Sequence, residues 1–134
     1  AMERFTVHAC TDITGFGLIG HLGEMVGGSG YNVRITASAV PVIAEALAFA
    51  DMGLLPAGAY RNREHRAGQV EIGAGVARAL ADLLFDPQTS GGLLIAVPGS
   101  MATAMTAELR TANVVEAAII GEVVAGPEER IFIS

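Results

Sequence analysis

The sequence predicts an α+β fold, a mixed β-sheet covered by helices, and three observations lead to this prediction. Four stretches repeat apolar residues at helical spacing, and five short stretches have the apolar pattern of strands. The two kinds of element interleave along the chain, which is typical of helices packed on a sheet. A chain of 134 residues has the length of one domain, so we expect residues 1–134 to form a single one.

The first third of the chain predicts one helix and one strand. Residues 3–12 form a short approach that ends in a polar turn. Apolar residues then recur every three or four positions over 17–26, which predicts a helix, and the glycine-rich segment 27–30 ends it. Apolar and polar residues alternate over 31–36, which predicts a strand with one buried face.

The middle of the chain predicts two helices and a short strand. Pro41 suits the first turn of a helix, and apolar spacing continues that helix to Gly53. Residues 54–69 have no clear period and are predicted to form a long loop. A short strand over 70–72 and a helix over 76–84 follow.

The last third of the chain predicts three strands and a helix. Pro87 ends the preceding helix, because the residue before proline avoids helical dihedral angles. The continuous apolar run 93–97 predicts a central strand covered on both faces. A helix over 100–109 and two final strands over 117–124 and 130–133 complete the pattern.

Composition excludes several classes of function. The net charge is −6 and the chain has no lysine, which argues against a nucleic-acid-binding surface. No apolar run approaches the ~20 residues needed to span a membrane, and no signal-peptide pattern is present. The basic run 61–66 contains its own Glu64 and is predicted to be part of a solvated loop rather than an anion site.

Hydrophobic residues make up 51% but aromatic residues only 5%, so the core must be aliphatic.

The few nucleophilic and metal-ligating side chains form no obvious catalytic group. Cys10 is the single cysteine, which fits a reducing, cytoplasmic location and predicts a buried structural thiol. His8 lies two residues away, but no third group orients the pair for nucleophilic catalysis. His21 is predicted to be a surface or hydrogen-bonded core histidine rather than a metal ligand.

The turn before the first helix is the stretch with the clearest chemistry. Thr11, Asp12 and Thr14 belong to residue types that cap helix N-termini, and Gly15 and Gly17 allow close approach of the backbone. Free N–H groups at a helix start attract anions, whereas a carboxylate repels them unless a divalent cation lies between. The turn therefore predicts a site for a metal and a phosphate, and the alternative is a simple cap and tight corner.

A second polar, glycine-containing turn comprises Gln88, Thr89, Ser90, Gly91 and Gly92. Neither turn contains an arginine, and the chain lacks the lysine that often contacts a transferring phosphoryl group. One carboxylate and two glycine turns amount to half of a phosphate site.

Both turns resemble motifs of a known family. Residues 11–22, Thr-Asp-Ile-Thr-Gly-Phe-Gly-Leu-Ile-Gly-His-Leu, resemble the motif that opens the C-terminal domain of selenophosphate synthetases, the selenide, water dikinases. Residues 86–94, Asp-Pro-Gln-Thr-Ser-Gly-Gly-Leu-Leu, are similar to a second motif of that family, and residues 58–63 resemble the loop after its second helix. The resemblance implies the C-terminal fold of aminoimidazole ribonucleotide synthetase-like proteins.

The resemblance also implies an activity and a division of labour. The full enzyme converts ATP, selenide and water to selenophosphate, AMP and phosphate with Mg²⁺, and it is a homodimer. Its N-terminal ATP-binding domain, absent from this chain, supplies most of the ATP site, most metal-binding aspartates and the catalytic cysteine or selenocysteine. Cys10 does not match that cysteine, so no catalytic residue is expected here, and the isolated chain is expected to be inactive.

Residue roles follow from motif position within this resemblance. Asp12 matches the aspartate that the C-terminal domain lends to the metal. Thr11, Thr14, Gly15 and Gly17 would lie near the nucleotide phosphates. The second turn would shape the domain rather than contact ATP. Alternatives are a free-standing binding or regulatory domain, or the equivalent domain of another ATP-dependent member of the superfamily.

Overall fold

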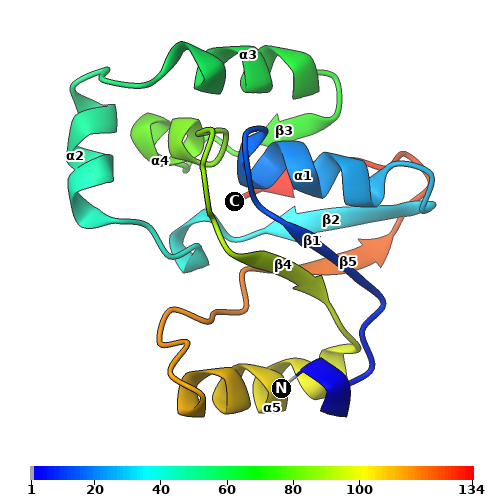
Figure 1. Cartoon of the computed structure of the whole chain (residues 1–134). Coiled ribbons are helices and arrows are strands. Elements are labelled where there is room, and N and C mark those ends of the chain that lie inside the picture. The colour runs from blue at the N-terminus through cyan, green and yellow to red at the C-terminus, as the bar shows by residue number, and fades with distance from the viewer. Residues whose placement is uncertain (1) are drawn as a thin grey trace.

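The computed structural model describes residues 2–134 and contains two separate β-sheets with helices around them (Figure 1). The larger sheet has the strand order β3-β6-β2-β5. Its strands are β2 (Tyr31–Ile35), β3 (Val70–Ile72), β5 (Gly121–Ala125) and β6 (Ile131–Ile133). The neighbours β3 and β6 are parallel, as are β6 and β2, whereas β5 is antiparallel to β2. The prediction of an α+β fold with a mixed sheet is confirmed.

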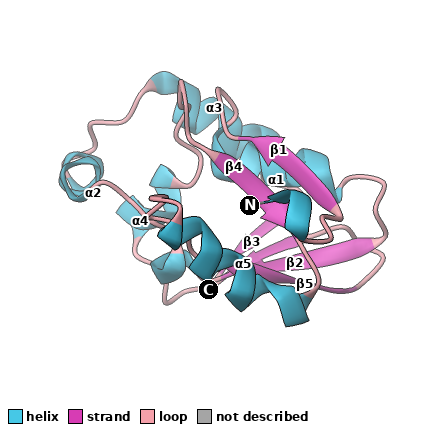
Figure 2. Ribbon diagram, turned by 60° about the horizontal axis from the view of Figure 1, so that its bottom comes forward, coloured by secondary structure: helices cyan, strands magenta, loops and turns pink. Residues whose placement is uncertain are grey.

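The smaller sheet is an antiparallel pair, β1 (Ala9–Asp12) with β4 (Leu93–Ala96). Figure 2 shows this pair set apart from the larger sheet. The prediction that 93–97 is a central strand covered on both faces is wrong, because β4 has β1 as its one strand partner among residues 2–134. One face of the pair is open, and Leu93 is 59% exposed there.

Five α-helices and two short 3₁₀ helices, Met2–Arg4 and Ala37–Ala39, connect the strands in residues 2–134. The α-helices are α1 (Gly17–Val26), α2 (Ala44–Asp51), α3 (Ala57–Arg66), α4 (Arg78–Leu83) and α5 (Gly99–Thr111). Helices α2, α3 and α4 gather at one end of the molecule and α5 lies at the other (Figure 1). Helix α1 contacts β1, β2 and α3, so it lies between both sheets and the helical end.

The core is mainly aliphatic, as the composition predicts. Its most deeply buried side chains are Ile19, Ile35, Leu84, Phe85, Ile131 and Ile133. Helix α1 buries almost every residue over its first two turns, because it packs on the larger sheet and on the segment that follows α4. This packing fixes the N-terminal end of α1, which follows the glycine-containing turn at residues 11–17.

The prediction of a loop over 54–69 is wrong, because α3 occupies most of it. The helix buries one small residue, Ala59, and its other inward contacts are polar, made by Asn62, Arg63 and Arg66. A search for apolar periodicity detects helices that bury apolar stripes. Helix α3 has no such stripe, because hydrogen bonds and ion pairs make most of its inward contacts. Apolar periodicity therefore could not predict it.

Several element boundaries also differ from the predictions. The second helix begins at Ala44 rather than Pro41, and Ile43 is 72% exposed. The fourth predicted strand, 117–124, forms a strand only over Gly121–Ala125. The helix predicted over 76–84 is shorter, and the first helix has the bounds that its period predicts. No helix in residues 2–134 has the length and apolar character needed to cross a bilayer.

Strand β2 departs from simple alternation at one polar residue. Asn32 is buried although the pattern predicts it to face solvent, and Tyr31 is exposed. The Asn32 amide donates to Glu128 at 3.0 Å, and its carbonyl accepts from the backbone N–H of Arg130 at 2.9 Å. Because both polar ends are paired, the side chain can be buried beside β6.

Candidate functional site

The two glycine-containing turns lie side by side. In the β1–β4 register, Asp12 pairs with Leu93. Beyond Asp12, the Ile13 N–H donates to the Gly92 carbonyl at 2.9 Å, and the Gly91 N–H donates to the Ile13 carbonyl at 2.8 Å. Segments nearly eighty positions apart in the sequence therefore form one unit, through backbone hydrogen bonds that any residue types could make.

The second turn packs closely against the first. A Cβ atom on Gly91 would lie 2.8 Å from Cγ2 of Ile13 and 2.6 Å from Oε1 of Gln88, so only glycine fits there without rearrangement. The backbone N–H of Gln88 donates to the Thr14 carbonyl at 3.1 Å. The side chains of Thr89 and Ser90 are exposed. These contacts hold the second turn against the first, and its predicted shaping role stays a prediction.

The entry into α1 does not use the predicted side-chain caps. The N-cap position is Phe16, and no side chain caps the helix, so the prediction of a Thr or Asp cap is wrong. The Gly17 N–H donates to the Thr14 carbonyl at 3.0 Å, and the Ile19 N–H donates to the Leu84 carbonyl at 3.1 Å. Two of the first N–H groups of the helix are thus occupied by backbone carbonyls.

Thr14 turns its hydroxyl toward α1 instead. Its Oγ1 lies 3.0 Å from Nε2 of His21, which is 7% exposed. The other ring nitrogen of His21 lies 3.4 Å from a carboxylate oxygen of Glu24, and the Phe16 ring packs at 5.4 Å between centroids. The prediction of a hydrogen-bonded histidine is confirmed.

Asn62 of α3 connects this turn to the segment that follows α4. Its side-chain amide donates to the Gly15 carbonyl and to the Phe85 carbonyl, both at 3.0 Å. In the sequence, Asn62 stands out only because it lies in the stretch 58–63, which resembles a family motif. The prediction of a loop there does not indicate which groups its side chain contacts.

We expect Asn62→Ala to lower the free energy of unfolding by about 1–2 kcal/mol, because it leaves the buried Phe85 carbonyl unpaired. Urea unfolding measures the change, and Glu64→Ala, an exposed position of the same helix, is the matched control. Equal effects of the two substitutions would contradict a role for the Asn62 amide.

Asp12 ends β1 with its side chain exposed, and Cys10 is exposed as well. The prediction of a buried cysteine is wrong, because the pair of strands leaves one face open. No ion pair found in residues 2–134 includes Asp12, and those residues contain no group of three or more His, Cys, Asp or Glu that could hold a metal. Near the second turn, burial raises the pKa of the Asp86 carboxyl above its ordinary value.

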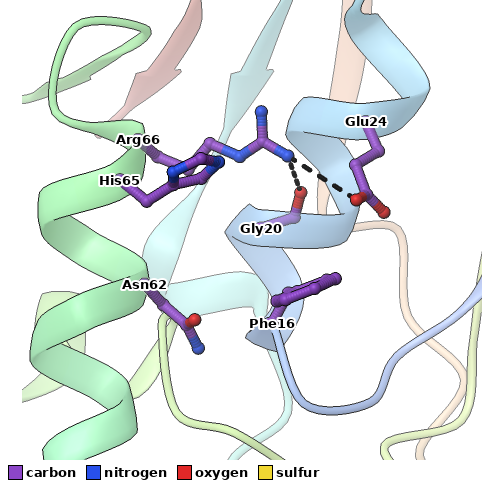
Figure 3. A pocket seen from close by; sticks show the side chains of 6 residues that line it. All are labelled: Phe16, Gly20, Glu24, Asn62, His65 and Arg66. Carbon is purple, nitrogen blue, oxygen red and sulfur yellow. Dashed lines mark hydrogen bonds and ion pairs between the residues drawn. The ribbon is translucent and has the colours of Figure 1, made fainter.

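A small pocket lies between α1 and α3, behind the turn. Figure 3 shows its lining residues, which are Phe16, Gly20, Glu24, Asn62, His65 and Arg66. The Arg66 guanidinium donates to the Gly20 carbonyl at 2.9 Å and approaches Glu24 at 4.0 Å. None of these six lining residues is a predicted site residue of either turn.

Comparisons with known proteins agree with the motifs. Residues 1–134 match the family described as AIR synthase related protein, C-terminal domain. The chain is 58% identical over 132 residues to a selenide, water dikinase of Pelobacter propionicus and 41% identical over 133 residues to selenide, water dikinase 2 of Peptoclostridium acidaminophilum. The two alignments include 98% and 99% of this chain, respectively, but the chain spans only 38% of the length of either relative.

A solved structure shares the fold. The hydrogenase maturation protein HypE superimposes with a TM-score of 0.58 and 22% sequence identity, over 95% of this chain and 33% of that one. This likeness concerns the fold alone. Because the family match extends over the whole chain, the protein belongs to the family of AIR synthase related protein C-terminal domains.

Proposed function

We propose that the chain is the C-terminal domain of a selenide, water dikinase, which converts ATP, selenide and water to selenophosphate, AMP and phosphate. The observation that carries the proposal is the junction of the two turns, with the exposed carboxylate of Asp12 at its edge. The identity to selenide, water dikinases over nearly the whole chain supports it. The domain closes over an ATP site and contributes one carboxylate to it.

The carboxylate of Asp12, at the edge of the two joined turns, is a suitable ligand for Mg²⁺. This ion is commonly held by one or two carboxylates together with substrate phosphates, so one exposed carboxylate is an adequate contribution. Asp12 would hold the ion, and Thr11, Thr14, Gly15 and Gly17 would line the mouth around it. When bound, the ion neutralises negative charge on the phosphates.

The remaining parts of the site come from elsewhere in the proposed enzyme. The chain spans 38% of the length of its relatives, so an N-terminal ATP-binding domain of the same protein is the expected partner. The full enzyme would be a cytoplasmic homodimer, and this domain alone would not turn over ATP. The exposed face of the β1–β4 pair leaves Asp12 accessible to such a partner.

We expect Asp12→Asn in the full-length protein to lower kcat/KM for selenide-dependent AMP formation by at least about 100-fold, because it removes a charge that stabilises the transition state through the metal. Stability should change little, because the side chain is exposed and takes part in none of the ion pairs found in residues 2–134. Glu116→Gln, which also neutralises an exposed carboxylate, is the control. Full activity of Asp12→Asn would refute the assignment.

Calorimetry on the 134-residue chain distinguishes the proposal from a free-standing nucleotide-binding domain. We expect no heat of Mg-ATP binding from the chain or from Asp12→Asn, because the chain holds one carboxylate of a shared site. Micromolar binding that disappears in Asp12→Asn would favour the free-standing domain instead.

A further inference from the structure

A row of three polar side chains lies behind the first turn, and only one of them, Thr14, belongs to the function proposed above. It runs from the Thr14 hydroxyl to the His21 ring and on to the Glu24 carboxylate, with separations of 3.0 Å and 3.4 Å. The imidazole is almost fully buried, whereas Glu24 is exposed and Thr14 is partly buried. The row therefore connects the mouth of the proposed site to the surface of α1.

The chemistry of the row determines where its protons lie. The Glu24 carboxylate lies 3.4 Å from Nδ1, and its negative charge favours the form of His21 that carries its hydrogen on that nitrogen. In neutral imidazole the other nitrogen, Nε2, is then an acceptor. The Thr14 hydroxyl lies 3.0 Å from Nε2, so it donates its only hydrogen to that nitrogen.

Arg66 supports the carboxylate end of the row. Its guanidinium lies 4.0 Å from Glu24 and donates to the Gly20 carbonyl at 2.9 Å (Figure 3). It also donates to the side-chain oxygen of Gln69 at 3.2 Å. A Cβ atom on Gly23 would lie 2.8 Å from the guanidinium carbon, so the missing side chain leaves room for Arg66 across α1. Arg66 therefore places a positive charge beside the carboxylate end of the row.

We infer that His21 is a positioning residue which makes the Thr14 hydroxyl a pure acceptor at the mouth of the site. With its hydrogen committed to Nε2, the partly buried Thr14 oxygen can only accept hydrogen bonds, and it lies two residues from Asp12 in the sequence. Such an oxygen suits a hydrated divalent cation, as a direct ligand or as an acceptor from its water. It cannot donate to a phosphate oxygen. The inference rests on the proposed function for the identity of this ligand.

The proton arrangement is tested on the chain itself by ¹⁵N-correlated NMR of the histidine rings at alkaline pH. We expect His21 in the Nδ1–H form and a Thr14 hydroxyl proton protected from exchange. In Glu24→Ala, part of the population should move to the Nε2–H form, whereas Glu45→Ala, exposed on α2, should leave the ring unchanged. An Nε2–H ring in the unaltered chain would overturn the inference, and so would an unchanged ring in Glu24→Ala.

The role in cation binding is tested in the full-length protein by titration with Mg²⁺ and by Mn²⁺ binding measured with electron paramagnetic resonance. Thr14→Val keeps the shape but lacks the hydroxyl, and we expect it to weaken cation binding about 10–100-fold. His21→Phe should weaken binding in the same direction, and Thr14→Ser should recover most of the loss in Thr14→Val. Unfolding curves identify variants that fail to fold, and Thr14→Ser against Thr14→Val remains a test if His21→Phe does.

The two proposals fail in different ways. If the full-length protein forms AMP with selenide but Thr14→Val binds cations as tightly as the unaltered protein, the positioning role is refuted and the proposed function stands. If no selenide-dependent activity exists, the proposed function is refuted, and the ring form of His21 still reports on the row.

Discussion

Gly17→Ala is expected to lower the free energy of unfolding by about 3 kcal/mol. Gly17 has φ of +71°, a conformation that costs an L-residue roughly 1–2 kcal/mol. An added Cβ would also lie 2.7 Å from the backbone carbon of Phe85 and 2.9 Å from the carbonyl oxygen of Asp86. These are backbone atoms that no rotamer change can move, so overpacking adds about 1–3 kcal/mol.

Gly28→Ala is the matched control for this prediction. Gly28 has nearly the same φ, +76°, but a Cβ there would meet no atom within 4 Å. It should therefore cost only the conformational part, about 1 kcal/mol. Urea unfolding of both variants separates the two contributions, and similar losses would show that contact with Phe85 is unimportant. In Gly17→Ala the amide of Ile19, bonded to Leu84, should also exchange faster with solvent.

Arg63→Met is expected to destabilise the protein by about 3 kcal/mol. Arg63 of α3 pairs with Asp82 of α4, whose side chain is only 8% exposed. Removing the partner leaves a buried carboxylate without compensation, which is far more costly than losing an exposed pair. Arg78 also approaches Asp82, at 3.6 Å, and limits the loss. Thermal and urea unfolding measure the change.

Two variants sharpen this second prediction. Arg78 is 88% exposed, so Arg78→Met should cost less than about 1 kcal/mol. Combining Arg63→Met with Asp82→Asn removes the stranded charge, and the double variant should recover at least about 1 kcal/mol. If the double variant is less stable than Arg63→Met alone, the loss comes from the contact of the Arg63 guanidinium with the Phe85 ring, 6.0 Å from its centroid, and not from the buried charge.

Much of the candidate site could be predicted from the sequence because its parts are local. Helix α1 has an uninterrupted apolar face, and the turn before it concentrates glycine and a carboxylate within a few residues. Each glycine turn could be predicted separately, because its residues are contiguous in the sequence. Their roles toward a metal and a nucleotide stay predictions until Asp12→Asn is measured.

Other parts could not be predicted, because they depend on partners far away in the chain. Helix α3 has no apolar stripe, and its position depends on Arg63 meeting Asp82 and Asn62 meeting the carbonyls of Gly15 and Phe85. In residues 2–134, β4 lies in a sheet of two strands and Leu93 is exposed, and the apolar run 93–97 encodes neither property.

The sequence by itself determined the α+β class, the aliphatic core, the first helix and both glycine turns, because each depends on spacing, composition or backbone freedom within a short segment. Only the tertiary structure decided that the turns form one unit and that Thr14 faces His21. The physical reason is that these contacts use backbone groups and single side chains brought together by β1 and β4 pairing and by α1 packing. Such contacts leave no periodic trace in the sequence.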